Sequence, residues 1–118
     1  MAVRNLGAMF RPRSVAVIGA SNRPASVGAT VFRNLLQGGF AGPIMPVNPR
    51  HEAVAGVLAY ADVAALPLAP DLAVICTPAP TVPGLIAELA GRGTRAAVVL
   101  SAGLREGRDN TGVGLSQR

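Results

Sequence analysis

Four loops hold the residues of this chain whose types could do chemistry, and each loop directly follows a run of apolar residues. The loops are Gly19-Ala20-Ser21, Asn48-Pro49-Arg50, Thr77-Pro78-Ala79-Pro80 and Ser101-Ala102-Gly103. Glycine lets a ligand approach the backbone, and the free N–H groups at a helix N-terminus attract phosphate. Arginine can add a paired contact to a phosphate. Together these loops predict a binding edge for a phosphorylated nucleotide.

The first loop departs from the fingerprint of dinucleotide-binding proteins, which is G-x-G-x-x-G at a strand-to-helix turn. The second glycine is missing after Gly19, and the next glycine is Gly28, nine positions later. We expect a wider loop in which Gly28 lets the helix N-terminus approach a phosphate and Ser21 adds a hydroxyl. Replacement of Gly28 by a bulky residue such as leucine is therefore expected to block phosphate approach while leaving the fold largely intact.

The second loop argues against NAD. An NAD site needs a carboxylate for the ribose hydroxyls at the end of the second strand. This chain has Val47, Asn48, Pro49 and Arg50 there, and Glu52 is the first carboxylate to follow. An arginine at this place suits a phosphorylated ribose, as in coenzyme A or NADP. Taken singly, Arg50 could equally be a solvated surface residue.

The third loop contains two prolines, so its backbone is stiff and lacks two N–H groups. We expect residues 77–80 to form an apolar wall for the flat face of an adenine. Thr81 is expected to cap the following helix first and to contact a ligand only second. Cys76 ends an apolar run and is expected to be a core residue, since nothing near it in sequence would lower its pKa.

The elements that position these loops alternate between strands and helices. Strands are expected at 14–19, 43–47, 57–59, 71–76 and 96–100, and helices at 5–10, 27–37, 62–66 and from Thr81 to Gly91 or Gly93. Such alternation favours an α/β fold, a Rossmann-like doubly wound parallel sheet in three α/β/α layers. The expected strand order is 3-2-1-4-5, with residues 57–59 as strand 3.

Composition narrows the functional classes. The chain has 118 residues, half of them apolar, which suits one domain with a real core. The net charge of +5 comes from scattered arginines without lysine, and aromatics are only 3%, so nucleic-acid binding is not expected. There is no membrane-spanning run or secretory signal, and the single cysteine fits a reducing cytoplasm.

Five blocks of sequence resemble the N-terminal CoA-binding domain of ADP-forming acyl-CoA synthetases. The same domain occurs in the α subunit of succinyl-CoA synthetase and in synthetase-like bacterial protein acetyltransferases. The blocks are residues 14–21, 46–49, 70–75, 78–83 and 98–103, and the resemblance extends from about residue 6 to 107. Five blocks in order are more specific than any one of them.

The resemblance implies coenzyme A as the ligand and a role for each loop. Gly19, Ala20, Ser21 and Gly28 would cradle phosphates; Val47, Asn48, Pro49 and Arg50 would lie along the ribose and its phosphate; Thr77, Pro78, Ala79, Pro80 and Val82 would flank the adenine or the pantetheine arm; Ser101 and Gly103 would lie near the thiol. The phosphorylated histidine and the ATP-grasp segments of that family have no counterpart here, since His51 lies in the wrong block. No catalytic residue and no metal site are expected.

The favoured interpretation is the CoA-binding domain of an NDP-forming acyl-CoA ligase, holding CoA for thioester formation. Residues 1–107 would form the domain and residues 108–118 a polar tail at a truncation point, with the other ligase and ATP-grasp domains, or another copy of the chain, as partners. The alternatives are a stand-alone CoA-binding regulatory module, the N-terminal domain of a protein acetyltransferase, and a fragment of an NADP-dependent oxidoreductase. The natural length of the reading frame would separate the module from the ligase or acetyltransferase.

Overall fold

The computed structural model describes residues 12–100, and all statements on structure concern that part of the chain. Four parallel strands form one sheet in the order β2-β1-β5-β6. Their bounds are β1 (Val15–Ile18), β2 (Ile44–Val47), β5 (Leu72–Ile75) and β6 (Ala96–Val99). All four residues of β1, β5 and β6 are buried, as expected of parallel strands covered on both faces. The expected helix at 5–10 lies outside the described residues.

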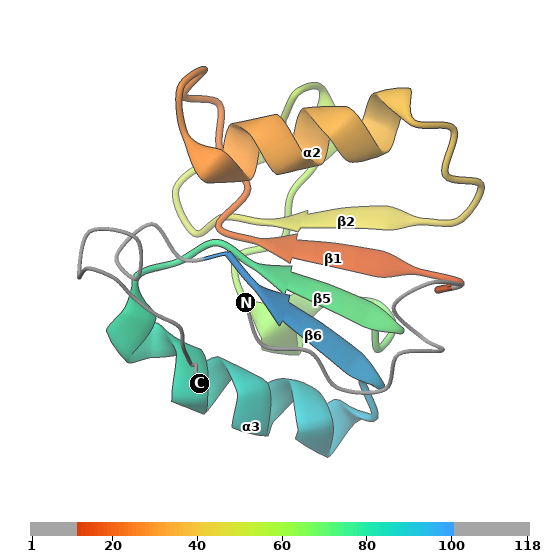
Figure 1. The fold of residues 1–118 in the computed structure, drawn as a ribbon, viewed down its shortest axis with the longest axis vertical. Coiled ribbons are helices and arrows are strands. Elements are labelled where there is room, and N and C mark those ends of the chain that lie inside the picture. The colour runs from red at the N-terminus through yellow and green to blue at the C-terminus, as the bar shows by residue number, and fades with distance from the viewer. Residues whose placement is uncertain (1–11, 101–118) are drawn as a thin grey trace.

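Two helices cover the opposite faces of the sheet (Figure 1). Helix α2 (Val27–Gln37) packs on one face through Phe32, which is buried together with Val17 and Val74. Helix α3 (Val82–Arg92) packs on the other face through Leu89, in a second cluster. The doubly wound α/β class is therefore confirmed. Ser26 fixes the start of α2, because its Oγ accepts a hydrogen bond of 3.1 Å from the Ala29 N–H.

Residues 57–59 were expected to pair with β2 as the edge strand of the main sheet, and this prediction is wrong. Strand β4 (Val57–Leu58) pairs antiparallel with β3 (Ala53–Val54) in a separate two-stranded sheet. The turn between them has positive φ at Ala55 (49°) and Gly56 (80°), the conformation of a tight hairpin turn that folds the chain back at once. Within residues 12–100, the backbone pairing of this segment with β2 is limited to a bridge at Tyr60, whose N–H donates to the Pro46 carbonyl over 2.9 Å. A single bridging residue thus takes the place of strand 3.

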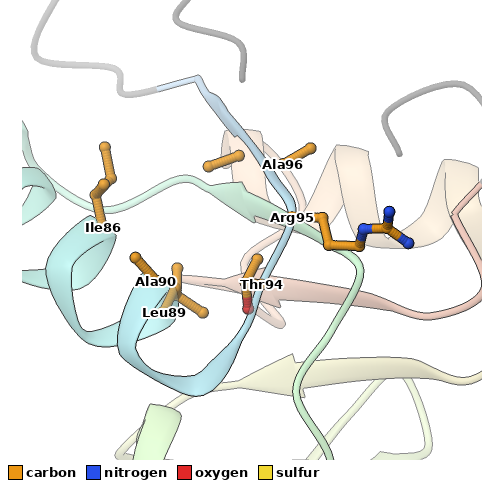
Figure 2. Close-up of a pocket in the computed structure, with 7 residues that line it drawn as sticks. Ile86, Leu89, Ala90, Thr94, Arg95 and Ala96 are labelled. Atoms are coloured by element: carbon orange, nitrogen blue, oxygen red, sulfur yellow. The ribbon is translucent and has the colours of Figure 1, made fainter. Parts of the chain in front are cut away.

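A small pocket lies at the carboxyl end of α3, beside Thr94 (Figure 2). Its volume is about 10 Å³, and Leu89 and Ala97 are among the residues that line it. The Thr94 hydroxyl is buried and has no hydrogen-bond partner within residues 12–100. Such a pocket has room for about one water molecule and excludes any larger ligand.

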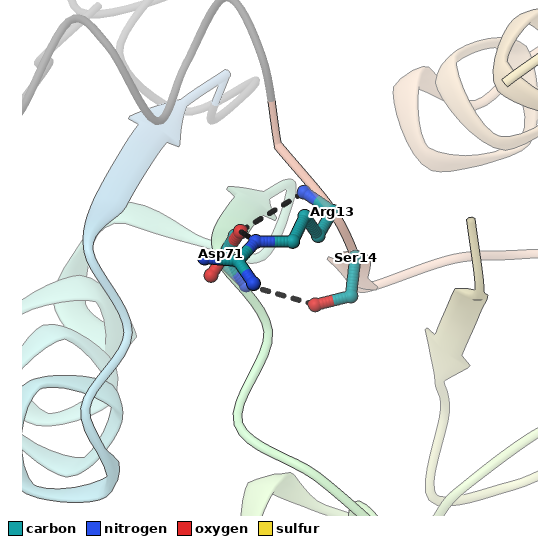
Figure 3. A network of polar contacts seen from close by, with 3 residues as sticks. All are labelled: Arg13, Ser14 and Asp71. Atoms are coloured by element: carbon teal, nitrogen blue, oxygen red, sulfur yellow. Dashed lines mark hydrogen bonds and ion pairs between the residues drawn. The ribbon is translucent and has the colours of Figure 1, made fainter. Parts of the chain in front are cut away.

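The amino-terminal edge of the sheet is closed by a polar network (Figure 3). The Arg13 N–H donates to the Asp71 carboxylate over 2.9 Å, and the Asp71 N–H donates to Ser14 Oγ over 3.0 Å. The Arg13 guanidinium lies 3.9 Å from the same carboxylate, but its side chain is 85% exposed, so this ion pair adds little. The two hydrogen bonds donated by backbone N–H groups link the start of β1 to Asp71, the residue that precedes β5.

No helix within residues 12–100 is long and apolar enough to cross a membrane. The same range contains no group of His, Cys, Asp and Glu side chains that could hold a metal ion.

Candidate functional site

The carboxyl ends of the strands lie at one edge of the sheet, and the chain leaves this edge in two directions. Helix α2 follows β1 on one face, whereas α3 follows β5 on the other (Figure 1). Strands β1 and β5 are neighbours, so the winding reverses between them. A reversal of this kind opens a crevice beyond the strand ends, which is where ligands bind in open α/β sheets.

A cavity of about 250 Å³ opens at this edge, and we call it the carboxyl-edge cavity. It is lined by Ile18, Gly19, Val47, Asn48, Pro49, Ala61, Asp62, Val63, Thr77, Thr81 and Leu85. The lining is mostly apolar and comes from the loops after β1, β2 and β5, from the segment that begins η1 (Val63–Ala65), and from the first turns of α3. Pockets for drug-sized ligands have about 300–1,000 Å³, so this cavity suits one part of a larger ligand.

Gly19 brings the ends of β1 and β5 together. Its φ is +92°, a region that favours glycine, and a Cβ there would lie 3.1 Å from both the Cys76 carbonyl carbon and Thr77 Cγ2. Gly19 therefore lines the cavity because only a residue without a side chain fits between these strand ends.

Gly28 has a packing role that the sequence did not reveal. It is buried in the first turn of α2, and a Cβ at this position would overlap the Gly19 carbonyl oxygen. The expectation that Gly28→Leu leaves the fold largely intact is therefore wrong. Gly28 lets α2 approach the end of β1, which is the role of a close-packing glycine.

Two polar side chains of the predicted site hold their own loops in shape. Ser21 Oγ accepts a bond of 2.9 Å from the Arg23 N–H. Asn48 Nδ2 donates to the Ala20 carbonyl over 2.8 Å, and Asn48 Oδ1 accepts from the Arg50 N–H over 2.7 Å. Asn48 thus links the loops after β1 and β2, while the exposed Arg50 side chain extends from this fixed turn.

Thr77 and Thr81 form a hydroxyl pair at the cavity wall. Thr81 Oγ1 donates to the Pro78 carbonyl over 2.6 Å, and the two hydroxyl oxygens are 2.6 Å apart. Because the single Thr81 proton goes to Pro78, the Thr77 proton must bond to Thr81. The expectation that the Thr81 side chain caps the helix is wrong, since it makes no capping bond to α3.

The remaining predicted residues lie beside the cavity or outside the described range. Pro78 precedes the 3-10 turn η2 (Ala79–Thr81), and none of Pro78, Ala79 and Pro80 lines the cavity. Val82 packs against the core cluster beneath α3. Ala20 is fully buried and contributes its carbonyl. Ser101 and Gly103 lie outside the described residues.

A family model described as a CoA binding domain matches residues 13–110. The chain belongs to the CoA binding domain family. The family predicted from the five sequence blocks is therefore confirmed.

Curated relatives of this CoA binding domain are named as a CoA synthase or as CoA ligases. A trans-feruloyl-CoA synthase from an unknown prokaryotic organism is 47% identical over 98 residues, which are 83% of this chain and 14% of the relative. The ADP-forming acetate–CoA ligase II of Archaeoglobus fulgidus is 39% identical over 104 residues, which are 88% of this chain and 16% of the relative. The chain thus spans about a seventh of the length of these proteins.

Solved structures show the same relationship. The dinucleotide forming acetyl-coenzyme A synthetase 1 of Candidatus Korarchaeum cryptofilum, in complex with phosphate and ADP, superposes with a TM-score of 0.71 and 37% identity. The match covers 76% of this chain and 19% of that chain. A crystal structure of a Pyrococcus horikoshii OT3 protein gives a TM-score of 0.78 at 37% identity, covering 89% of this chain and 24% of that one. The CoA binding domain is thus homologous to part of the ADP-forming ligases.

Several lining residues of the CoA binding domain escaped the sequence reasoning. The sequence places Asp62, a residue type that often caps helices, at the start of the helix expected at 62–66 and Leu85 within the helix expected from Thr81, and it assigns neither to a ligand site. The cap is real, because Asp62 Oδ1 accepts from the Ala65 N–H over 2.9 Å. The sequence offered only a weak signal that these two residues line a ligand site, namely that both lie in segments that follow a strand or bridge at the carboxyl edge.

Cys76 lies at the same edge, directly after β5. The side chain is half-buried, and burial raises the pKa of the Cys76 thiol from 9.0 to about 11. Burial therefore favours the protonated thiol, and Cys76 packs, partly buried, against the cluster that contains Val17 and Phe32.

A second cavity of about 250 Å³ lies beside the loop after β1 on the side of α2. Ser21, Asn22 and Arg33 are among its lining residues. Asn22 is already engaged, because its Nδ2 donates to the Ala53 carbonyl over 3.0 Å and its Oδ1 accepts from the Ala55 N–H over 3.0 Å. This amide therefore holds the β3–β4 hairpin against the loop.

Proposed function

We propose that the carboxyl-edge cavity and the loops around it bind coenzyme A, and that this chain is the CoA-binding part of an ADP-forming acyl-CoA ligase. The observation that carries the proposal is a mostly apolar cavity at the point where the winding reverses, in a chain of the CoA binding domain family. The relatives are named as CoA ligases or synthetases, which supports a parent enzyme that forms a thioester.

The ligand is larger than the cavity, so different parts of CoA take different places along the edge. The apolar cavity suits the base or the pantetheine arm. The phosphates suit the outer rim, where the Arg50 side chain is exposed and α2 begins. The N–H groups of Val27 and Gly28 belong to the first turn of α2 and have no intrahelical acceptor, which favours an anion there.

Within the proposed ligase, this domain contributes binding and orientation. Coenzyme A held along a rigid sheet edge presents its thiol to an acyl group in a fixed direction, which lowers the entropic part of the barrier. The acyl-transfer chemistry itself belongs to other parts of the proposed parent protein.

Two of the alternatives share their ligand with this proposal, and the third does not. A stand-alone CoA-binding module and the domain of a protein acetyltransferase would use the same edge for the same ligand. An NADP-dependent fragment would bind NADP in preference to CoA.

The test is a calorimetric titration of the 118-residue chain with CoA, dephospho-CoA, NAD and NADP. We expect CoA to bind and dephospho-CoA, which lacks the 3′-phosphate, to bind more weakly. Binding of NADP in preference to CoA would overturn the proposal. The length of the natural reading frame then distinguishes a ligase from a single-domain module.

A further inference from the structure

Among the residues of the described range 12–100 that line the carboxyl-edge cavity, Asp62 is the only charged one. Its two carboxylate oxygens have different surroundings. Oδ1 accepts the Ala65 N–H over 2.9 Å and so fixes the orientation of the side chain. Within residues 12–100, Oδ2 accepts no hydrogen bond and pairs with no cation. One oxygen is therefore held by the fold, and the other is available to a ligand.

The polar groups near Asp62 also have fixed roles. The Thr77 proton is used by Thr81, so the Thr77 oxygen offers only lone pairs to a ligand. The Asn48 side chain bonds to both adjoining loops. The rest of the wall consists largely of Ile18, Val47, Val63 and Leu85 side chains. The side-chain oxygens at this wall thus complement a ligand that is apolar in body and carries a hydrogen-bond donor.

We propose that Asp62 is a specificity-determining residue of the carboxyl-edge cavity, where its free carboxylate oxygen accepts a hydrogen bond from a donor group of the bound ligand. This inference rests on the proposed function, because it assumes that CoA occupies the cavity. CoA carries two groups that combine an apolar body with a donor: the exocyclic amine of adenine and the amide N–H groups of the pantetheine arm. Phosphate groups are excluded, because they are anions and Asp62 is an anion as well.

The substitution Asp62→Asn keeps the acceptor at Oδ1 and replaces the acceptor at Oδ2 by a hydrogen-bond donor. An asparagine at this position still caps the turn, because its Oδ1 can accept the Ala65 N–H. Its Nδ2 then takes the place of Oδ2 and presents a donor where the native protein presents an acceptor. The variant should therefore disfavour a donor on the ligand and favour an acceptor.

The test uses calorimetric titration of the 118-residue chain with CoA, adenosine 3′,5′-bisphosphate, inosine 3′,5′-bisphosphate and pantetheine. Inosine replaces the adenine amine by a carbonyl oxygen. We expect Asp62→Asn to weaken the adenosine compound by about ten- to hundredfold and to bind the inosine compound at least as well as the native chain does. If the donor is instead the pantetheine amide, the loss appears with pantetheine and with CoA, and the two nucleotides are unaffected.

The matched control is Glu88→Gln, which removes one negative charge from an exposed position on α3 outside the cavity. It should bind all four compounds like the native chain. A second variant, Asp62→Ser, keeps one capping oxygen and deletes the other, so it should lose affinity without gaining any preference for inosine. Thermal unfolding of the three variants verifies that each is folded.

The outcomes separate the two proposals. If the native chain binds CoA but Asp62→Asn and Asp62→Ser bind every compound unchanged, the role of Asp62 is overturned and the proposed function stands. An equal loss in Glu88→Gln would also overturn it, since the effect would then come from net charge. If the native chain binds neither CoA nor its parts, the proposed function fails and this inference fails with it.

Discussion

The amino and carboxyl edges of the sheet carry similar polar residues, but only the carboxyl edge has a cavity of ligand size within residues 12–100. At the amino edge, Arg13, Ser14 and Asp71 satisfy one another and close the space between β1 and β5. At the carboxyl edge, Asn48 links two loops and Thr81 bonds within its own, yet a cavity of about 250 Å³ remains. The difference arises because α2 and α3 leave the carboxyl edge on opposite faces (Figure 1). The binding edge is thus distinguished by topology rather than by polar composition.

The largest effect is expected where helix and strand meet at the carboxyl edge. Gly28→Ala should destabilise the fold by about 3 kcal/mol, because the added Cβ overlaps the Gly19 carbonyl oxygen and one backbone must move. Denaturant unfolding measures the change. The matched control is Gly84→Ala on α3, where an added Cβ meets no atom within 4 Å. It should stabilise the protein by roughly 0.5–1 kcal/mol through helix propensity. A Gly28→Ala variant as stable as the native chain would contradict the close packing.

The reactivity of Cys76 tests whether the carboxyl edge contains an activated thiol, a feature that the amino edge lacks within residues 12–100. With the thiol pKa raised to about 11, alkylation by iodoacetamide at pH 8 should be roughly tenfold slower than for a thiol of pKa 9.0, after allowing for the greater nucleophilicity of the more basic thiolate. The raised pKa contributes stability that is complete below about pH 9 and is lost as the pH rises through about 11. Mass spectrometry follows the alkylation, and unfolding of the native chain and of Cys76→Ala between pH 8 and 11 follows the stability. Rapid alkylation of the folded protein at pH 8 would point to an exposed, activated thiol instead.

Arg50 tests the outer rim of the proposed site. Arg50→Gln should weaken CoA binding by roughly three- to tenfold, because an exposed arginine–phosphate contact is partly screened by solvent. The same substitution should leave dephospho-CoA almost unaffected if Arg50 meets the 3′-phosphate. Calorimetry with both ligands gives the comparison, and Arg95→Gln, an exposed arginine that precedes β6, is the control. Equal losses for both ligands would assign Arg50 to another phosphate or to none.

The smallest effects are expected at the amino edge, and there they should concern stability alone. Asp71→Ala should cost about 1 kcal/mol, because it removes the acceptor of the Arg13 N–H. Arg13→Ala should cost less than about 0.5 kcal/mol, because the guanidinium is exposed and 3.9 Å from the carboxylate. CoA affinity should be unchanged in both variants. A change in affinity would show that the two edges are energetically coupled.

The sequence was sufficient to predict the class of fold and most of its elements. The helix Val27–Gln37, the four apolar strands and the alternation of strands with helices follow from local patterns, which depend on residues a few positions apart. The loops that contain Gly19, Asn48 and Thr77 were also predicted correctly as neighbours, because parallel strands place their carboxyl ends together. Each of these inferences needs only local chemistry and one general rule of topology.

The tertiary structure decided the features that depend on distances between remote residues. Gly28 is required by the approach of α2 to the Gly19 carbonyl, and no local pattern reports that separation. The hairpin at Ala55 and Gly56 replaces the expected edge strand, because its tight turn places β4 antiparallel to β3. Asp62 became part of the cavity because Tyr60 bridges to β2 and sets the following residues beside the strand ends. A sequence pattern specifies which residues are buried or capped, whereas only packed backbones determine which of them share a cavity.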